Sequence, residues 1–234
     1  MSAAFPETFA PSIPVPTDAN PWHVEQGDAV DLMFKLEPYS VDVIVTDPAY
    51  ESLEKHRAVG TTTRLKKEWF PIFRNNRFAS FFQAAYRTLK PNAHLYVMCD
   101  AETMFAIKTL GEAAGFKFWK PLVWDKCAIG MGYHYRARCE FVLFFEKGKR
   151  KLNHLGTPDV LSFPRVRNGY PTEKPVELMR TLIRQSSSAG DVVLDPFCGS
   201  GATGEAAIYC DRLFLGFDIS ERAVKLSSER LGAL

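Results

Sequence analysis

Two apolar stretches that end in Asp-Pro decide the fold of this chain: VDVIVTDPAY (residues 41–50) and DVVLDPFCGSG (residues 191–201). In each stretch a run of β-branched and aliphatic residues precedes the acid, which is typical of a strand buried on both faces. Predicted strands alternate with predicted helices along the rest of the chain. This alternation predicts an α/β fold with a mostly parallel sheet covered by helices on both faces. Ligands bind such sheets at the carboxyl ends of the strands, so we expect the two acids to line one crevice.

The apolar periodicity places the individual elements. Strands are expected at residues 22–25, 41–45, 93–99, 116–124, 140–146, 192–194 and 213–217. Helices are expected at residues 29–36, 77–89, 101–114, 175–186, 203–209 and 221–231. Residues 52–73 and 152–170 show no clean period, so we expect loops there.

Bulk composition favours a soluble, single-domain protein. The 234 residues are 46% hydrophobic and 24% charged, and no run approaches the roughly 18 apolar residues of a membrane span. Residues 1–21 are rich in proline and are expected to form an extended arm ahead of a single domain at 22–234. The five cysteines form no C-x-x-C pair and have no metal-ligand spacing with histidine. We therefore predict a reduced, cytoplasmic location and no metal site.

The glycine-rich strand end at residues 195–201 predicts a cofactor loop. Gly199 and Gly201 remove Cβ atoms where the backbone passes close to a ligand, and Asp195 can accept hydrogen bonds from an ammonium group. Asp218 ends the next strand, about twenty residues later, where an acid can hold ribose hydroxyls. A nucleoside that carries an amino acid, S-adenosylmethionine, fits this spacing. A phosphate loop does not fit, because the third glycine and the G-K-[ST] sequence are missing; the other alternative is a plain strand-to-helix turn.

The aromatic strand end, Asp47-Pro48-Ala49-Tyr50, predicts a site for an exocyclic amine of a nucleobase. Such an amine is a poor nucleophile, because its lone pair is delocalised into the ring. The Asp47 carboxylate and the Pro48 carbonyl can accept hydrogen bonds from the NH₂ group, and Tyr50 can stack on the base. A base must leave the duplex to enter such a pocket, and stacking offsets about 1–3 kcal/mol of that cost. The alternative is an ordinary β-turn, in which Asp-Pro is common.

The order of these two motifs resembles that of the β-class amino-methyltransferases of DNA, in which a D-P-P-Y motif precedes the cofactor loop. The resemblance covers nearly the whole chain from about Trp22. It implies a three-layer, Rossmann-like methyltransferase fold that depends on S-adenosylmethionine, with a mostly parallel seven-stranded sheet and one antiparallel strand. It divides the domain into a catalytic half at 22–148, a short linker at 149–171 and a cofactor-binding half at 172–234.

The resemblance also implies site residues. Gly27-Asp28 resembles the family's adenosine contact, and Thr172-Glu173-Lys174-Pro175 resembles its T-x-K-P segment beside the methionine end of the cofactor. The segment from Trp124-Asp125-Lys126 through Glu140 to Gly148 resembles the one that lines the target-base pocket. The expected catalytic residues are Asp47, Pro48 and Tyr50. The expected cofactor-binding residues are Asp28, Asp47, Thr172, Lys174, Asp195, Pro196, Phe197, Cys198, Gly199, Ser200, Gly201, Thr203 and Asp218.

The chain departs from the family pattern in two places. Ala49 stands where the family has the second proline, and only about two dozen residues, 149–171, lie where a recognition region is usual. That length is too short for a separate recognition domain. Sequence readout would then come from loops such as 52–74 or 130–138, or would be very relaxed.

Those loops belong to two basic segments that suit a nucleic-acid partner. Residues 51–77 hold seven basic and three acidic side chains, and residues 126–151 hold seven basic and two acidic ones. Basic side chains there can contact phosphates, and tyrosines that alternate with them can stack on bases. The expected nucleic-acid contacts are Lys66, Lys67, Arg74, Tyr133, Tyr135, Arg136 and Arg138. Solvated lysine-rich loops are the plain alternative.

We therefore predict a DNA adenine-N6 methyltransferase with short or relaxed specificity, acting on double- or single-stranded DNA. Analogy with the family adds a possible homodimer. The alternatives are a cytosine-N4 methyltransferase, an RNA or free-base methyltransferase, and a catalytically silent binding subunit. The family's cytosine enzymes more often carry serine in place of Asp47, which favours adenine. A silent subunit would have lost the acid or tyrosine of the catalytic motif or the loop glycines, and all of these are present.

Overall fold

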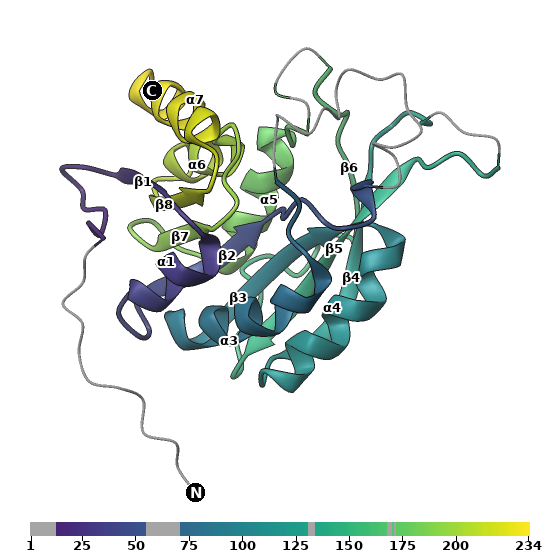
Figure 1. Ribbon diagram of the computed structural model, residues 1–234, viewed down its shortest axis with the longest axis horizontal. Coiled ribbons are helices and arrows are strands. Elements are labelled where there is room, and N and C mark those ends of the chain that lie inside the picture. Colours follow the sequence, from purple (N-terminus) through teal and green to yellow (C-terminus); the bar gives the residue numbers. More distant parts are fainter. Residues whose placement is uncertain (1–12, 55–70, 131–133, 168–169, 171) are drawn as a thin grey trace, which may run out of the picture.

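The protein forms one eight-stranded sheet with helices on both faces (Figure 1). The computed structural model describes residues 13–54, 71–130, 134–167, 170 and 172–234. The strands are β1 (Trp22–Gln26), β2 (Val41–Thr46), β3 (Leu89–Cys99), β4 (Lys117–Asp125), β5 (Cys139–Lys147), β6 (Val160–Ser162), β7 (Val192–Asp195) and β8 (Leu213–Asp218). The helices are α1 (Ala29–Lys35), the 3₁₀ turn η2 (Asn75–Arg77), α3 (Phe78–Thr88), α4 (Ala101–Ala113), α5 (Val176–Ser186), α6 (Ala202–Ile208) and α7 (Glu221–Gly232).

The strand order confirms the predicted fold class. The strands follow the order β1-β8-β7-β2-β3-β5-β4-β6, and only β5 runs antiparallel to its neighbours. The expected seven strands are all present, together with an eighth that the sequence did not show. β6 lies inside the segment expected to be a loop, and it pairs with β4 from Val123 to Asp125. Three residues are too few to show an alternating pattern, so β6 could be recognised only from its pairing.

Two hydrophobic clusters, one on each face of the sheet, explain why the strand at residues 41–46 is buried along its whole length. Ile44 packs in the cluster that includes α1, α3 and α4, whereas Val43 and Val45 pack in the cluster that includes α5, α6 and α7. Figure 1 shows the first three helices together on the near face of the sheet. The sheet is thus the middle of three layers, and its central strand is buried on both sides.

β2 and β7 lie side by side at the point where the chain changes direction across the sheet. Val43 pairs with Val193 and Ile44 with Leu194. From β2 the chain continues to β3 on one side, and from β7 it continues to β8 on the other. This is the position at which open α/β sheets bind ligands. The two Asp-Pro turns follow these two strands.

The arm and one strand differ in detail from what the sequence suggested. Ile13, within the expected extended arm, is 4% exposed and packs in the first cluster. β3 begins at Leu89 instead of Ala93, because Leu89 already pairs with Val41 before an irregularity in the register.

None of the helices in the described ranges is long and apolar enough to cross a membrane.

Candidate active site

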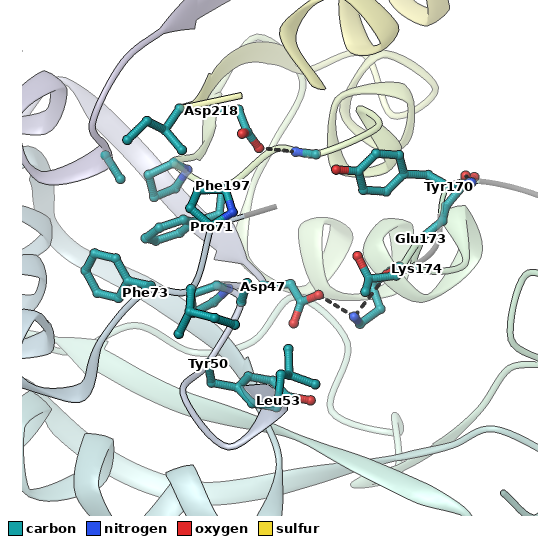
Figure 2. Close-up of a pocket in the computed structure, with 18 of the residues that line it drawn as sticks. Asp47, Tyr50, Leu53, Pro71, Phe73, Tyr170, Glu173, Lys174, Phe197 and Asp218 are labelled. Atoms are coloured by element: carbon teal, nitrogen blue, oxygen red, sulfur yellow. Dashed lines mark hydrogen bonds and ion pairs between the residues drawn. The ribbon is translucent and has the colours of Figure 1, made fainter. Parts of the chain in front are cut away.

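A cavity of about 410 Å³ opens at the carboxyl ends of β2 and β7 (Figure 2). Its volume lies within the range of small-molecule sites. It is lined by the predicted residues Asp28, Asp47, Pro48, Tyr50, Thr172, Lys174, Pro196, Phe197, Gly199 and Asp218. A smaller space shares Asp47, Lys174 and Phe197 with it and is lined in addition by Asp195, Cys198, Ser200 and Thr203. The prediction that both acids line one crevice is therefore confirmed.

Asp47 is held by a lysine from the other half of the chain. The Nζ of Lys174 forms a short ion pair with Asp47 Oδ2 and also donates to the carbonyl of Thr172, at 3.2 Å. Asp47 Oδ1 is buried and has no hydrogen-bond partner among the described residues. The carboxylate of this cavity-lining residue is thus fixed through one oxygen, and the other oxygen is a buried acceptor without a partner among the described residues.

The charges around Asp47 alternate in sign. Glu140 Oε2 lies 3.8 Å from Lys174 Nζ, and Glu140 Oε1 lies 3.3 Å from Lys126 Nζ. Burial alone would lower the pKa of Lys174, but the charges of Asp47 and Glu140 outweigh burial and raise it. Burial raises the pKa of Asp47, and Glu140 adds to this increase, whereas Lys174 opposes it. Lys174 is accordingly a permanent cation at neutral pH.

Tyr50 and Trp124 form the apolar end of the cavity. Tyr50 is 8% exposed, and its pKa is raised well above the usual value, mainly by burial. The turn that carries Tyr50 is held by a hydrogen bond from the Phe73 amide to the Ala49 carbonyl, at 2.8 Å. The Trp124 indole donates to the Phe163 carbonyl, at 2.8 Å. Two flat side chains thus line the same cavity as Asp47, where a planar ring can be enclosed.

Asp195 is buried more deeply than Asp47 and is more fully hydrogen-bonded. It accepts from Thr46 Oγ1 at 2.7 Å and from the Phe197 amide at 3.1 Å, and Thr203 also donates to it. Burial raises its pKa to about 6, although these hydrogen bonds oppose the change. Asp195 can hold the loop in shape and still present negative charge to an ammonium group.

The two glycines of the loop at residues 195–201, Gly199 and Gly201, have different roles. Both have positive φ, +51° at Gly199 and +82° at Gly201. The Gly199 amide donates to Asp218 Oδ2 at 2.9 Å, which joins the loop to the end of β8. A Cβ at Gly201 would lie 2.9 Å from the Ser227 Cβ in α7. Gly201 lines neither space, so its lack of a side chain serves the packing of α6 on α7 instead of the expected approach to a ligand.

Asp28 lines the cavity, but its carboxylate already has partners. It caps α1 by accepting from the Val30 amide at 3.0 Å, and Arg77 donates to both of its oxygens at 2.5 and 2.8 Å. The hydrogen bonds from Arg77 lower the pKa of Asp28. The Asp28–Arg77 pair therefore presents both an acceptor and a donor to the cavity. Sequence reasoning missed Arg77, because nothing in the local pattern links positions 49 residues apart.

The predicted nucleic-acid residues that the structure describes all lie outside the cavity lining. Arg74 pairs with Glu51 at 3.3 Å, and Arg138 binds both oxygens of Asp125 at 2.7 Å. Arg136 donates to the Gly130 carbonyl at 2.6 Å, and Tyr135 is fully exposed. Lys66, Lys67 and Tyr133 lie outside the described residues.

Three lining residues come from the linker, which sequence reasoning treated as too short for a separate recognition domain. Arg165, Val166 and Tyr170 contribute to the wall of the cavity. Their only sequence signal is the basic and aromatic composition of residues 165–170. The linker therefore forms part of the cavity wall.

Comparison with known proteins assigns the family. A model of the DNA methylase family matches residues 41–229. The chain belongs to the DNA methylase family. The DNA adenine methyltransferase YhdJ of Escherichia coli K12 is 28% identical over 244 residues, which cover 88% of this chain and 81% of YhdJ.

Two solved structures share the fold. The complex of M1.HpyAVI with S-adenosylmethionine has a TM-score of 0.67 at 23% identity and covers 90% of this chain and 100% of that one. The cytosine-N4-specific PvuII DNA methyltransferase has a TM-score of 0.74 at 18% identity, and the match covers 89% of this chain and 86% of that one. The predicted amino-methyltransferase family, fold class and cofactor S-adenosylmethionine are confirmed at the level of the family. This DNA methylase thus has a relative named as an adenine enzyme and a structural neighbour named as a cytosine-N4 enzyme.

Proposed function

We propose that this DNA methylase transfers a methyl group from S-adenosylmethionine to N6 of an adenine that has left its duplex or lies in a single strand. The observation that carries the proposal is the unpartnered, buried Oδ1 of Asp47 in the wall of a cavity that extends from Asp218 to Tyr50. A buried acceptor without a partner is costly, so a ligand donor is expected there. An exocyclic amine is such a donor.

The cavity residues fit the cofactor at one end and a base at the other. Asp218 can hold ribose hydroxyls, and Asp195 can accept from the ammonium group of the methionine end. Phe197 forms apolar wall beside Phe73, with ring centroids 4.8 Å apart. When bound, S-adenosylmethionine supplies a sulfonium methyl group, whose carbon–sulfur bond breaks as the carbon–nitrogen bond forms.

The chain's own part in this transfer is to localise the lone pair of the amine and to position it. Asp47 Oδ1 and the Pro48 carbonyl would accept the two N–H groups, which favours a more tetrahedral nitrogen. Tyr50 would pack on the ring. Acceleration then comes from the positioning of two reactants and from negative charge beside the nitrogen on which positive charge develops. The methylated ammonium is acidic enough to lose its proton without a strong base.

Adenine is favoured over cytosine because Asp47 occupies the first motif position and because the relative YhdJ is named as an adenine enzyme. The short linker supports a short or relaxed recognition sequence. The homodimer and the cytoplasmic location remain predictions.

The decisive experiment combines nucleoside mass spectrometry with a methylation map of DNA treated with the protein and isotope-labelled cofactor. We expect labelled N6-methyladenine in a motif shorter than five bases. Asp47→Ala should abolish turnover while cofactor affinity stays within about tenfold, since Asp47 is proposed to act on the amine. Labelled N4-methylcytosine would instead establish the cytosine alternative. A fully active Asp47→Ala variant would refute the catalytic role.

A further inference from the structure

Two unused hydrogen-bonding groups lie side by side in the cavity wall. One is Asp47 Oδ1, which is buried without a partner among the described residues. The other belongs to Lys174, whose ammonium has three N–H donors. One donor binds Asp47 Oδ2 and another binds the Thr172 carbonyl. The nearest oxygen of Glu140, at 3.8 Å, is too far for a hydrogen bond, so one N–H of Lys174 has no acceptor within the described part of the chain.

Burial makes both groups expensive to leave unpaired. Lys174 is 9% exposed and lines the cavity, as does Asp47. Figure 2 shows the two side chains facing each other in the middle of the site, with Asp218 to one side and Tyr50 to the other. A buried charged donor and a buried acceptor are both costly to leave unpaired. A ligand that offers an acceptor to the first and a donor to the second would therefore be strongly favoured.

That complement is an amino group next to a ring nitrogen. Adenine presents its amine beside N1, and cytosine presents its amine beside N3. Guanine and thymine reverse the pattern on the same edge, with a carbonyl oxygen beside an N–H. Enzymes that act on extruded bases read this edge with hydrogen bonds. The Asp47 acceptor and the cationic Lys174 donor together would therefore favour adenine and cytosine and disfavour guanine and thymine.

Building on the proposed function, we propose that Lys174 donates a hydrogen bond to the ring nitrogen beside the reacting amine and thereby selects amino-bearing bases. The ring nitrogen is N1 for adenine and N3 for cytosine. This role differs from a contact with the methionine end of the cofactor, which the T-x-K-P resemblance suggested for Lys174. Glu140, between Lys174 and Lys126, would act as a positioning residue for the donor.

The test replaces the ring nitrogen by carbon and combines this change with a variant of Lys174. Wild-type protein and Lys174→Met are compared on oligonucleotides with adenine or 1-deazaadenine at the methylated position. We expect the kcat/KM of the wild type to fall by about 10- to 100-fold on 1-deazaadenine, the range for a hydrogen bond to a charged group. Lys174→Met should be slow on both and should differ between them by less than about twofold. The same design uses 3-deazacytosine if the product is methylcytosine.

Two controls separate this role from others. 7-Deazaadenine changes the nitrogen on the far side of the amine and should affect wild type and Lys174→Met equally. Lys126→Met removes the other lysine beside Glu140 and should retain the sensitivity of the wild type to 1-deazaadenine. 7-Deazaadenine matches 1-deazaadenine in exchanging one ring nitrogen for carbon, and Lys126→Met matches Lys174→Met in size of change and in loss of charge.

Several results would overturn the inference. The wild type could methylate 1-deazaadenine as fast as adenine, a result that needs no variant and does not depend on how Lys174→Met folds. Lys174→Met could keep the full sensitivity to 1-deazaadenine and raise only the KM for S-adenosylmethionine, which would place Lys174 at the cofactor. Either result leaves the proposed function intact. Absence of methyl transfer from the wild type to adenine and cytosine alike would instead refute the proposed function.

Discussion

Asp47 and Asp195 are each followed by proline at the end of a buried strand, yet their carboxylates are held differently. Asp47 is fixed by Lys174 through one oxygen and has the other oxygen free. Asp195 accepts from Thr46, Thr203 and the Phe197 amide. The first arrangement leaves an acceptor for a substrate, and the second builds a rigid loop that still carries charge.

A pH dependence of cofactor binding follows at the residue scale. Burial raises the pKa of Asp195 to about 6, so this carboxyl is protonated below that pH in the free protein and ionised above it. An ammonium group binds the ionised form, so cofactor affinity should fall as the pH decreases from 7 to 5, by up to about tenfold per pH unit below 6. Calorimetric titration with S-adenosylmethionine at several pH values measures this affinity. Asp195→Asn should bind the cofactor more weakly at pH 7 and lose the pH dependence. If the affinity of Asp195→Asn changed with pH as steeply as that of the wild type, the pH dependence would belong to another group.

At the scale of elements, a buried polar network joins β3 to α5. His94, which is 0% exposed, shares a hydrogen bond with Ser186 at 2.7 Å, and Tyr96 shares one with the same serine at 2.6 Å. The other ring nitrogen of His94 faces the Arg150 carbonyl at 3.2 Å and Glu146 at 3.9 Å. α5 follows the T-x-K-P segment, so this network helps to place Lys174 over Asp47.

This network predicts a specific loss of stability in acid. Burial lowers the pKa of His94 to about 4, so the imidazole stays neutral in the folded protein but takes up a proton near pH 6.5 when unfolded. Its contribution to stability is present above pH 6.5 and is lost as the pH falls toward 4. Between pH 7 and 5 the free energy of unfolding should fall by about 2 kcal/mol through His94. Urea unfolding of wild type and His94→Gln at both pH values tests this, because equal falls in the two proteins would contradict it.

At the scale of the whole molecule, the cavity wall carries an exposed basic residue from the linker. Arg165 is exposed and lines the cavity, and it forms no ion pair or hydrogen bond within the described residues. Arg74 and Arg138, which sequence reasoning preferred, are held by carboxylates. An exposed arginine in the cavity wall, without a partner among the described residues, is better placed to contact a phosphate beside the extruded nucleotide.

Salt dependence should reveal this contact. Arg165→Ala should weaken DNA binding and reduce the slope of log affinity against log salt by about 0.7–0.9, the value for one phosphate contact. Arg184→Ala is the matched control, since Arg184 is an exposed arginine in the last turn of α5 that does not line the cavity. Filter binding or fluorescence anisotropy at several salt concentrations gives both slopes. Equal slopes for the two variants would show that Arg165 makes no phosphate contact.

The sequence by itself determined the class of sheet, the two Asp-Pro strand ends and the position of the glycine-rich loop. These features depend on local patterns, such as the mostly apolar run at 41–45 and the glycines at 199 and 201. Local patterns can be recognised in the sequence without knowledge of the fold. The short strand β6 carried no such pattern, because its existence depends on pairing with β4.

Only the tertiary structure decided which charges meet at Asp47. Lys174 lies 127 positions away along the chain, and Glu140 and Lys126 reach the same point from two other strand ends. The tertiary structure also shows that Gly201 lacks a side chain because Ser227 packs against it, and not because a ligand approaches. It shows in addition that residues of the linker form part of the cavity wall. The physical reason is that an ion pair or a close approach depends on distance in space, which the folding of β2 against β7 sets and which spacing along the chain does not record.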